Sequence, residues 1–180
     1  MALKATIYKA VLHVADMDRN YYEDLTLTIA RHPSETDERM MLRLVAFALH
    51  ASDRLQFTKG ISTQDEPDIW EKSLSDEIDL WIDLGLPEES RIRKACGRAR
   101  QVIIYAYGGR AVPLWWRKYQ DELTRFANLR IMEVSAETTK QLAELSQRAM
   151  DLQCTIQDGQ VWLSDASNSV AIEPVRLFPM

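Results

Sequence analysis

Residues 68–98 read DIWEKSLSDEIDLWIDLGLPEESRIRKACGR, and this stretch decides the fold. It contains two runs rich in strand-forming residues, 68–74 and 77–84, on either side of Ser75-Asp76. This pattern predicts a β-hairpin. Aromatic pairs and opposite charges stabilise a ladder when they lie directly across it. With a two-residue turn, the predicted pairs are Trp70 with Trp81, Lys72 with Asp79, and Leu74 with Glu77. The positions that then face a core are Ile78, Leu80, Ile82 and Leu84.

The same register sets Asp68 opposite Asp83. Their β-carbons are expected about 5 Å apart, where two like charges destabilise a ladder unless something compensates them. A divalent cation would do so, because carboxylates, carbonyls and waters make a typical Mg²⁺ site. The pair therefore predicts a site for Mg²⁺ or Mn²⁺. A second interpretation stays open, in which the strands separate at this end and both acids are solvated.

A helix is predicted after the chain reverses at Gly85-Leu86-Pro87. Its apolar stripe is Ile92, Ala95, Cys96 and Ala99. Its opposite face carries Arg91, Lys94 and Arg98. A lysine beside a metal-bound water positions the nucleophile and neutralises a phosphoryl transition state, so we predict this role for Lys94. Arg91 and Arg98 are predicted to hold phosphates. The other interpretation is a surface helix with ordinary solvent-facing bases.

Charge is divided along the chain. The 180 residues carry a formal net charge of −5, but residues 61–90 hold ten acids and one base, and residues 91–130 hold ten bases and two acids. The acidic total argues against tight, non-specific coating of nucleic acid. The two blocks are compatible with an acidic metal cleft beside a phosphate-binding helix. Equally, they are compatible with a solvated face whose charges neutralise each other across the fold.

The rest of the chain alternates strands and helices. The predicted elements are a hairpin of 5–14 and 21–30, a helix after Ser34 and Asp37 as a capping box, strands at 55–58, 102–107 and 129–134, helices after Pro113 and over 136–150, and a final hairpin at Asp158-Gly159. The class is α/β (α+β), one domain over 1–180, with a mixed β-sheet flanked by helices. Two cysteines and no bilayer-length apolar run predict a cytoplasmic protein without a membrane segment.

Six segments resemble the YaeQ family of bacterial proteins, nearly end to end. They are residues 1–8, His32-Pro33-Ser34-Glu35-Thr36, residues 79–87, Lys94-Ala95-Cys96, Phe126-Ala127-Asn128-Leu129, and Thr155-Ile156-Gln157-Asp158-Gly159. The resemblance implies a variant of the PD-(D/E)xK nuclease fold. In that superfamily an acid on one strand opposes an acid on the next, which a lysine follows two residues later.

That pattern implies Asp68 and Asp83 as the two acids, with Glu66 as a backup for Asp68. The lysine position holds Gly85 instead, and Lys94 on the following helix is the matching candidate. Glu38 lies where such nucleases can add an acid to the metal site.

The expected function is a Mg²⁺-dependent (or Mn²⁺-dependent) nuclease-like protein acting on phosphodiesters of DNA or RNA. The alternative is a non-catalytic nucleic-acid or protein-binding module, or a transcription-related regulator, on a nuclease scaffold. Gly85 in the lysine position favours the alternative. Because fold does not determine chemistry, both stay open.

Overall fold

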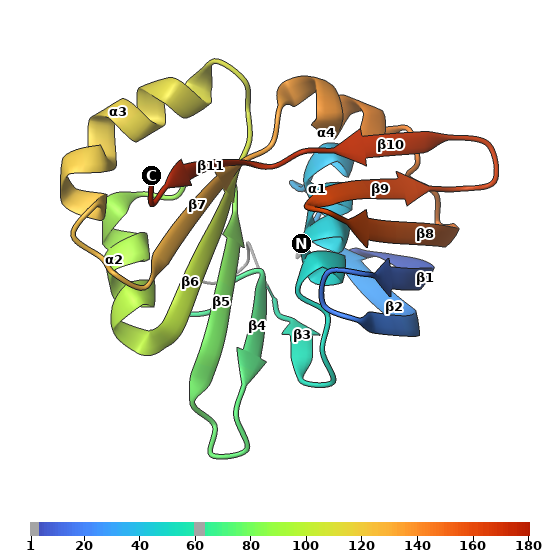
Figure 1. The fold of residues 1–180 in the computed structure, drawn as a ribbon, viewed down its shortest axis with the longest axis horizontal. Coiled ribbons are helices and arrows are strands. Elements are labelled where there is room, and N and C mark those ends of the chain that lie inside the picture. The colour runs from blue at the N-terminus through green and yellow to red at the C-terminus, as the bar shows by residue number, and fades with distance from the viewer. Residues whose placement is uncertain (1–3, 60–63) are drawn as a thin grey trace. The chain divides into compact units, whose positions relative to one another are not determined.

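The computed structural model describes residues 4–59 and 64–180, and the chain forms two compact units. The first unit contains the chain up to Ala51 together with Glu137–Glu173, and the second contains Ser52–Ala136 and Pro174–Met180. Each unit is built around its own β-sheet (Figure 1). The mixed α+β class is therefore confirmed, with two mixed sheets in place of the single sheet predicted.

The first unit has a five-stranded sheet in the order β10-β9-β8-β1-β2. Its elements are β1 (Thr6–Asp16), β2 (Tyr21–Arg31), α1 (Asp37–Leu49), α4 (Ala136–Ala143), β8 (Ala149–Gln157), β9 (Gln160–Ser164) and β10 (Ser169–Ile172). Strand β1 pairs antiparallel with β2 and parallel with β8. Alternate residues of β1, such as Leu12 and Val14, are buried, and α1 packs on β1 and β8. This is the alternation expected of a sheet with one covered face.

The second unit has a six-stranded sheet in the order β11-β7-β6-β5-β4-β3. Its elements are β3 (Leu55–Phe57), β4 (Ile69–Lys72), β5 (Ile78–Leu84), α2 (Glu89–Arg98), β6 (Ala99–Ala106), α3 (Ala111–Leu123), β7 (Leu129–Glu133) and β11 (Val175–Phe178). Strands β3, β4 and β5 form an antiparallel meander. Strands β5, β6 and β7 run parallel, because α2 and α3 carry the chain back between them. The core of this unit includes Trp81, Ile92, Val102 and Ile131.

The hairpin register was predicted correctly where it matters for the site. Pairs Ile69↔Ile82 and Trp70↔Trp81 are formed. The predicted pairs Lys72 with Asp79 and Leu74 with Glu77 are wrong, because Lys72 pairs with Ile78 across a register shift. The cause is a longer turn. Asp76 has a φ of 66° and donates its N–H to the Ser73 carbonyl at 3.0 Å, so the turn takes up an additional residue.

Other element boundaries also differ from prediction. Helix α1 is capped by Thr36, whose hydroxyl accepts the Arg39 N–H at 3.1 Å. The predicted cap Ser34 instead places its hydroxyl 2.7 Å from His32 Nδ1, in a local turn. The helix predicted over 136–150 ends at Ala143, because the chain from Ala149 onward pairs with β1 as β8. Strands β10 and β11 had no counterpart in the prediction. Among the described residues, no helix is long and apolar enough to cross a bilayer.

Candidate functional site

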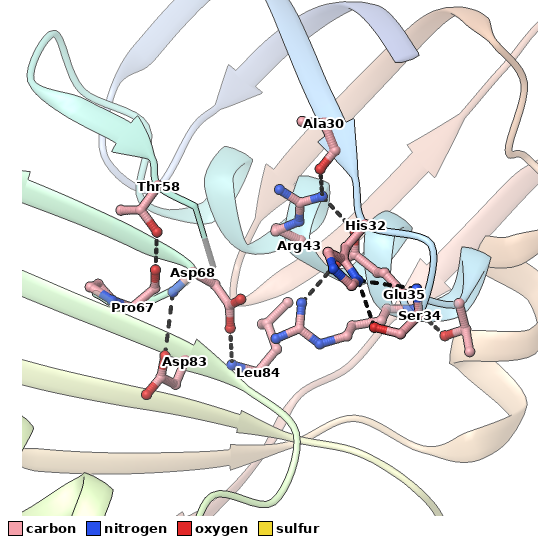
Figure 2. A network of polar contacts seen from close by, with 12 residues as sticks. Ala30, His32, Ser34, Glu35, Arg43, Thr58, Pro67, Asp68, Asp83 and Leu84 are labelled. Atoms are coloured by element: carbon pink, nitrogen blue, oxygen red, sulfur yellow. Dashed lines mark hydrogen bonds and ion pairs between the residues drawn. The ribbon is translucent and has the colours of Figure 1, made fainter. Parts of the chain in front are cut away.

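The structure brings Asp68 and Asp83 together at one end of the β4–β5 pair, in the second unit (Figure 2). Each is only 2% exposed. Asp68 donates its N–H to the Ile82 carbonyl at 3.1 Å, and the same backbone nitrogen lies 3.3 Å from Asp83 Oδ1. The Leu84 N–H donates to Asp68 Oδ2 at 2.9 Å. The alternative of frayed strands with solvated acids is therefore wrong, because both carboxylates are buried and bonded to the neighbouring strand.

The positive charge beside this pair comes from Arg91, on the first turns of α2. Its Nε donates to Asp83 Oδ2 at 2.9 Å and its Nη2 to Asp83 Oδ1 at 3.0 Å, a bidentate ion pair. The indole of Trp81 adds a hydrogen bond to Oδ2 at 3.1 Å. Burial raises the pKa of Asp83 above its ordinary value. The charge of Asp68 adds to that rise, while the hydrogen bonds from Arg91 and Trp81 oppose it.

Arg91 also donates hydrogen bonds to the chain just before β4. Nη1 donates to the Gln64 carbonyl at 3.1 Å, and Nη2 donates to the Glu66 carbonyl at 3.0 Å. The guanidinium is thus surrounded by two carboxylate and two carbonyl oxygens. Arg91, predicted to hold a phosphate, donates to the oxygens of Asp83, Gln64 and Glu66 in the structure.

Lys94 and Arg98 contact the same segment. Lys94 Nζ lies 2.6 Å from Asp65 Oδ1, and Arg98 Nη1 donates to the Asp65 carbonyl at 2.6 Å. The hydrogen bond from Lys94 lowers the pKa of Asp65. Arg98 also lies over the Trp81 ring, 5.2 Å from its centroid. Lys94 was predicted to approach the two buried acids, and its partner in the structure is Asp65 instead.

Asp65 is the residue at this site that sequence reasoning missed. The only sequence signal for Asp65 was its place in the acidic block of residues 61–90. Periodicity predicts no helix or strand around Asp65 itself, so its position in space could not be inferred. A cavity of about 290 Å³ lies beside it, lined by Gln64, Glu88, Ser90, Arg91 and Lys94.

The other two predicted metal ligands, Glu66 and Glu38, make contacts with residues other than Asp68 and Asp83. The Glu66 carboxylate lies 3.5 Å from the Lys59 backbone nitrogen. Glu38 belongs to α1 of the first unit, where its Oε2 lies 3.5 Å from Thr139 Oγ1. Over residues 4–59 and 64–180, no group of three or more His, Cys, Asp or Glu side chains is arranged to hold a metal ion.

The first unit contains a separate buried ion pair (Figure 2). Glu35 and Arg43 are each 4% exposed, and Arg43 Nη2 donates to Glu35 Oε1 at 2.7 Å and to the Ala30 carbonyl at 3.1 Å. Arg39 donates to the other Glu35 oxygen at 2.7 Å. Glu35 belongs to the segment His32-Pro33-Ser34-Glu35-Thr36, which carries part of the family resemblance. Through Arg43, its carboxylate connects the chain before α1 to β2.

Comparison with known proteins gives consistent results over nearly the whole chain. Residues 1–174 match the family described as "YaeQ protein". A Salmonella typhi protein described as "Uncharacterized protein YaeQ" is 54% identical over 173 residues, 96% of each chain. The Escherichia coli (strain K12) protein of the same description is 51% identical over 172 residues, 96% of this chain and 95% of that one.

Two crystal structures are similar. The YaeQ protein from Xanthomonas axonopodis pv. citri has a TM-score of 0.92 at 48% identity, covering 96% of this chain and 98% of that chain. The YaeQ protein from Pseudomonas syringae has a TM-score of 0.93 at 34% identity, covering 98% and 97%. The likeness therefore extends over nearly the whole chain and includes both units.

Proposed function

This chain belongs to the YaeQ family, and we propose that it is a divalent-cation-dependent hydrolase of nucleic-acid phosphodiesters, built on a variant PD-(D/E)xK fold. The observation that carries the proposal is the buried contact between Asp68 and Asp83 beside the basic face of α2. The family resemblance described in the sequence analysis implies the same two acids.

Burying two neighbouring carboxylates is costly. Burial disfavours each charged form, and the two like charges repel each other. Arg91 supplies one positive charge to Asp83, and both acids are only 2% exposed. Structural cores avoid such pairs, whereas sites that bind cations or move protons use them. The burial of two neighbouring acids therefore supports a role for the pair beyond folding.

The chemistry of the donors fits a hard divalent cation. Carboxylate and carbonyl oxygens are the ligands that Mg²⁺ prefers, and those of Asp83, Gln64 and Glu66 already surround the Arg91 guanidinium. We assign the cation to Asp68 and Asp83, with Glu66 of the same unit as a further candidate ligand. A bound cation would polarise a phosphoryl oxygen and lower the pKa of an attacking water.

The chain's own bases would handle the substrate. Lys94 and Arg98 present cationic groups on the face of α2 that carries Arg91. Arginine forks match the geometry of phosphate, and lysine acts as a mobile point charge. Lys94 would orient the attacking water only after leaving Asp65, because that carboxylate now holds its ammonium group.

Calorimetric titration of Mn²⁺ and Mg²⁺ tests the cation site. Wild type is expected to bind, whereas Asp68→Asn and Asp83→Asn are expected to lose binding. Glu77→Gln is the matched control, since Glu77 is an exposed acid of the same unit paired with Arg100 at 2.9 Å. Cleavage of plasmid DNA and of single-stranded RNA is measured on the same proteins. Absence of cation binding by wild type would refute the metal site.

A second candidate function is a non-catalytic nucleic-acid or protein-binding module. Two observations favour this binding function: Lys94 pairs with Asp65, and Gly85 stands at the superfamily's lysine position. Salt-dependent binding of DNA or RNA without metal-dependent cleavage would support this function. A transcription-related regulator would instead bind a protein partner, and that binding would survive loss of both Asp68 and Asp83.

A further inference from the structure

Residues 64–66, here termed the acidic strap, lie along the basic face of α2. Three successive residues of the strap each offer a backbone carbonyl to an arginine. Gln64 and Glu66 accept from Arg91, and Asp65 accepts from Arg98. The Asp65 carboxylate accepts from Lys94. All three predicted phosphate-handling bases of α2 are therefore bonded to one short segment.

The strap presents oxygens to these bases much as a nucleic-acid backbone would. Its acceptors come at successive positions of the chain, and they meet cations spaced along one helix face. Three of the four acceptors are neutral carbonyls, whereas each phosphodiester carries a full negative charge. Hydrogen bonds with an ionised acceptor are stronger than those with a neutral one. A phosphate backbone is accordingly a better partner for these bases than the strap.

The strap is also poorly anchored by its side-chain ion pair. The Asp65 and Lys94 side chains are 76% and 53% exposed, and exposed ion pairs contribute little to stability. The cavity of about 290 Å³ lies between strap residue Gln64 and the α2 residues Ser90, Arg91 and Lys94. It leaves room for a phosphate group to reach Arg91 and Lys94 before the strap moves.

We propose that the strap is an internal competitor for the phosphodiester site on α2, and that a nucleic-acid backbone binds by displacing it. This inference rests on the proposed function, because it assigns phosphate binding to Arg91, Lys94 and Arg98. It adds a consequence for the buried acids. Arg91 holds both the strap and Asp83, so a phosphate that draws Arg91 away also uncovers the carboxylate assigned to the cation.

The test measures binding of fluorescein-labelled 12-nucleotide DNA and RNA strands by anisotropy, in EDTA so that cation binding plays no part. Asp65→Asn is expected to tighten binding about twofold to fivefold, the effect of removing one exposed competing ion pair. Glu77→Gln makes the same change in net charge and removes the 2.9 Å ion pair with Arg100, which belongs to the same basic block. It is expected to change affinity less than about twofold.

The other outcomes separate the strap from the site. If Asp65→Asn and Glu77→Gln tighten binding equally, the proposed competition by the strap is overturned, because the change in net charge alone would explain the tighter binding. If Asp65→Asn has no effect while Lys94→Gln and Arg98→Gln weaken binding, the strap is overturned and the phosphate site stands. If wild type and all variants fail to bind either strand, the proposed function fails as well. Thermal unfolding of each variant shows that it is folded.

Discussion

Arg91 forms a bidentate ion pair with Asp83, with Nε 2.9 Å from Oδ2 and Nη2 3.0 Å from Oδ1. Asp83 is buried, while the Arg91 side chain is 25% exposed. The pair therefore joins an internal acid to a base at the surface. It connects the stability of the second unit to the chemistry proposed for it.

Removing Arg91 is expected to destabilise the protein. Arg91→Ala leaves a buried carboxylate without its ion pair, and breaking such a pair costs about 3 kcal/mol when one partner stays buried. Urea unfolding measures the loss. The matched control is Arg93→Ala on the same helix, since the Arg93 side chain is 57% exposed and its contact with Glu89 is 3.4 Å long. Equal losses in the two variants would contradict the special role of the Asp83 pair.

Asp83 is expected to make stability fall as pH rises. Its pKa in the folded protein lies above the ordinary value of 3.8, so between those two values the folded state binds more protons than the unfolded state. Linkage then requires the free energy of unfolding to decrease with rising pH through that window. The measurement compares urea unfolding of wild type and Asp83→Asn from about pH 4 to 7, since the variant lacks this titration. A difference that stays constant with pH would rule out the raised pKa.

His13 in the first unit is expected to titrate above its ordinary pKa of 6.5. Its ring nitrogens lie 2.7 Å from Asp24 and 3.0 Å from Asp151, on the two strands beside β1. The hydrogen bond with Asp24 is the largest cause of the raised pKa. Protonated His13 therefore stabilises the fold below pH 6.5, and this contribution is lost as pH rises through the folded pKa. NMR titration of the ring proton should show a lower midpoint in Asp24→Asn, and an unchanged midpoint would count against the contact.

Both thiols are expected to react slowly in the folded protein. Burial raises the pKa of Cys96 to about 11 and that of Cys154 to about 12. Because the thiolate is the nucleophile, iodoacetamide at about pH 8 should modify neither residue at the rate of an unfolded control. Mass spectrometry of Cys96→Ser and Cys154→Ser assigns any reaction to one thiol. Rapid modification of Cys96 in the folded chain would disprove the expectation.

Local sequence was sufficient to predict the centre of the site. Asp68 and Asp83 are brought together by a hairpin whose two strands are close in sequence, and the Trp70–Trp81 pair sets its register. The two faces of α2 follow from helical spacing, because residues three or four apart share a face. The turn at Asp76 was not predictable in the same way. Its φ of 66° depends on how the two strands meet, and Ser-Asp is a weak turn signal.

The sequence by itself determined most of the elements and which of their side chains share a face, since both depend on periodicity within a few residues, but it did not show β10, β11 or the end of α4. Only the tertiary structure decided which distant partners these faces meet. It placed β8 parallel to β1, pairing Lys9 with Ala149. It also paired Lys94 with Asp65 and Arg91 with Asp83. Long basic side chains reach several acids from one backbone position. The packing of the segment before β4 against α2 therefore selects the partner, and no local pattern records that choice.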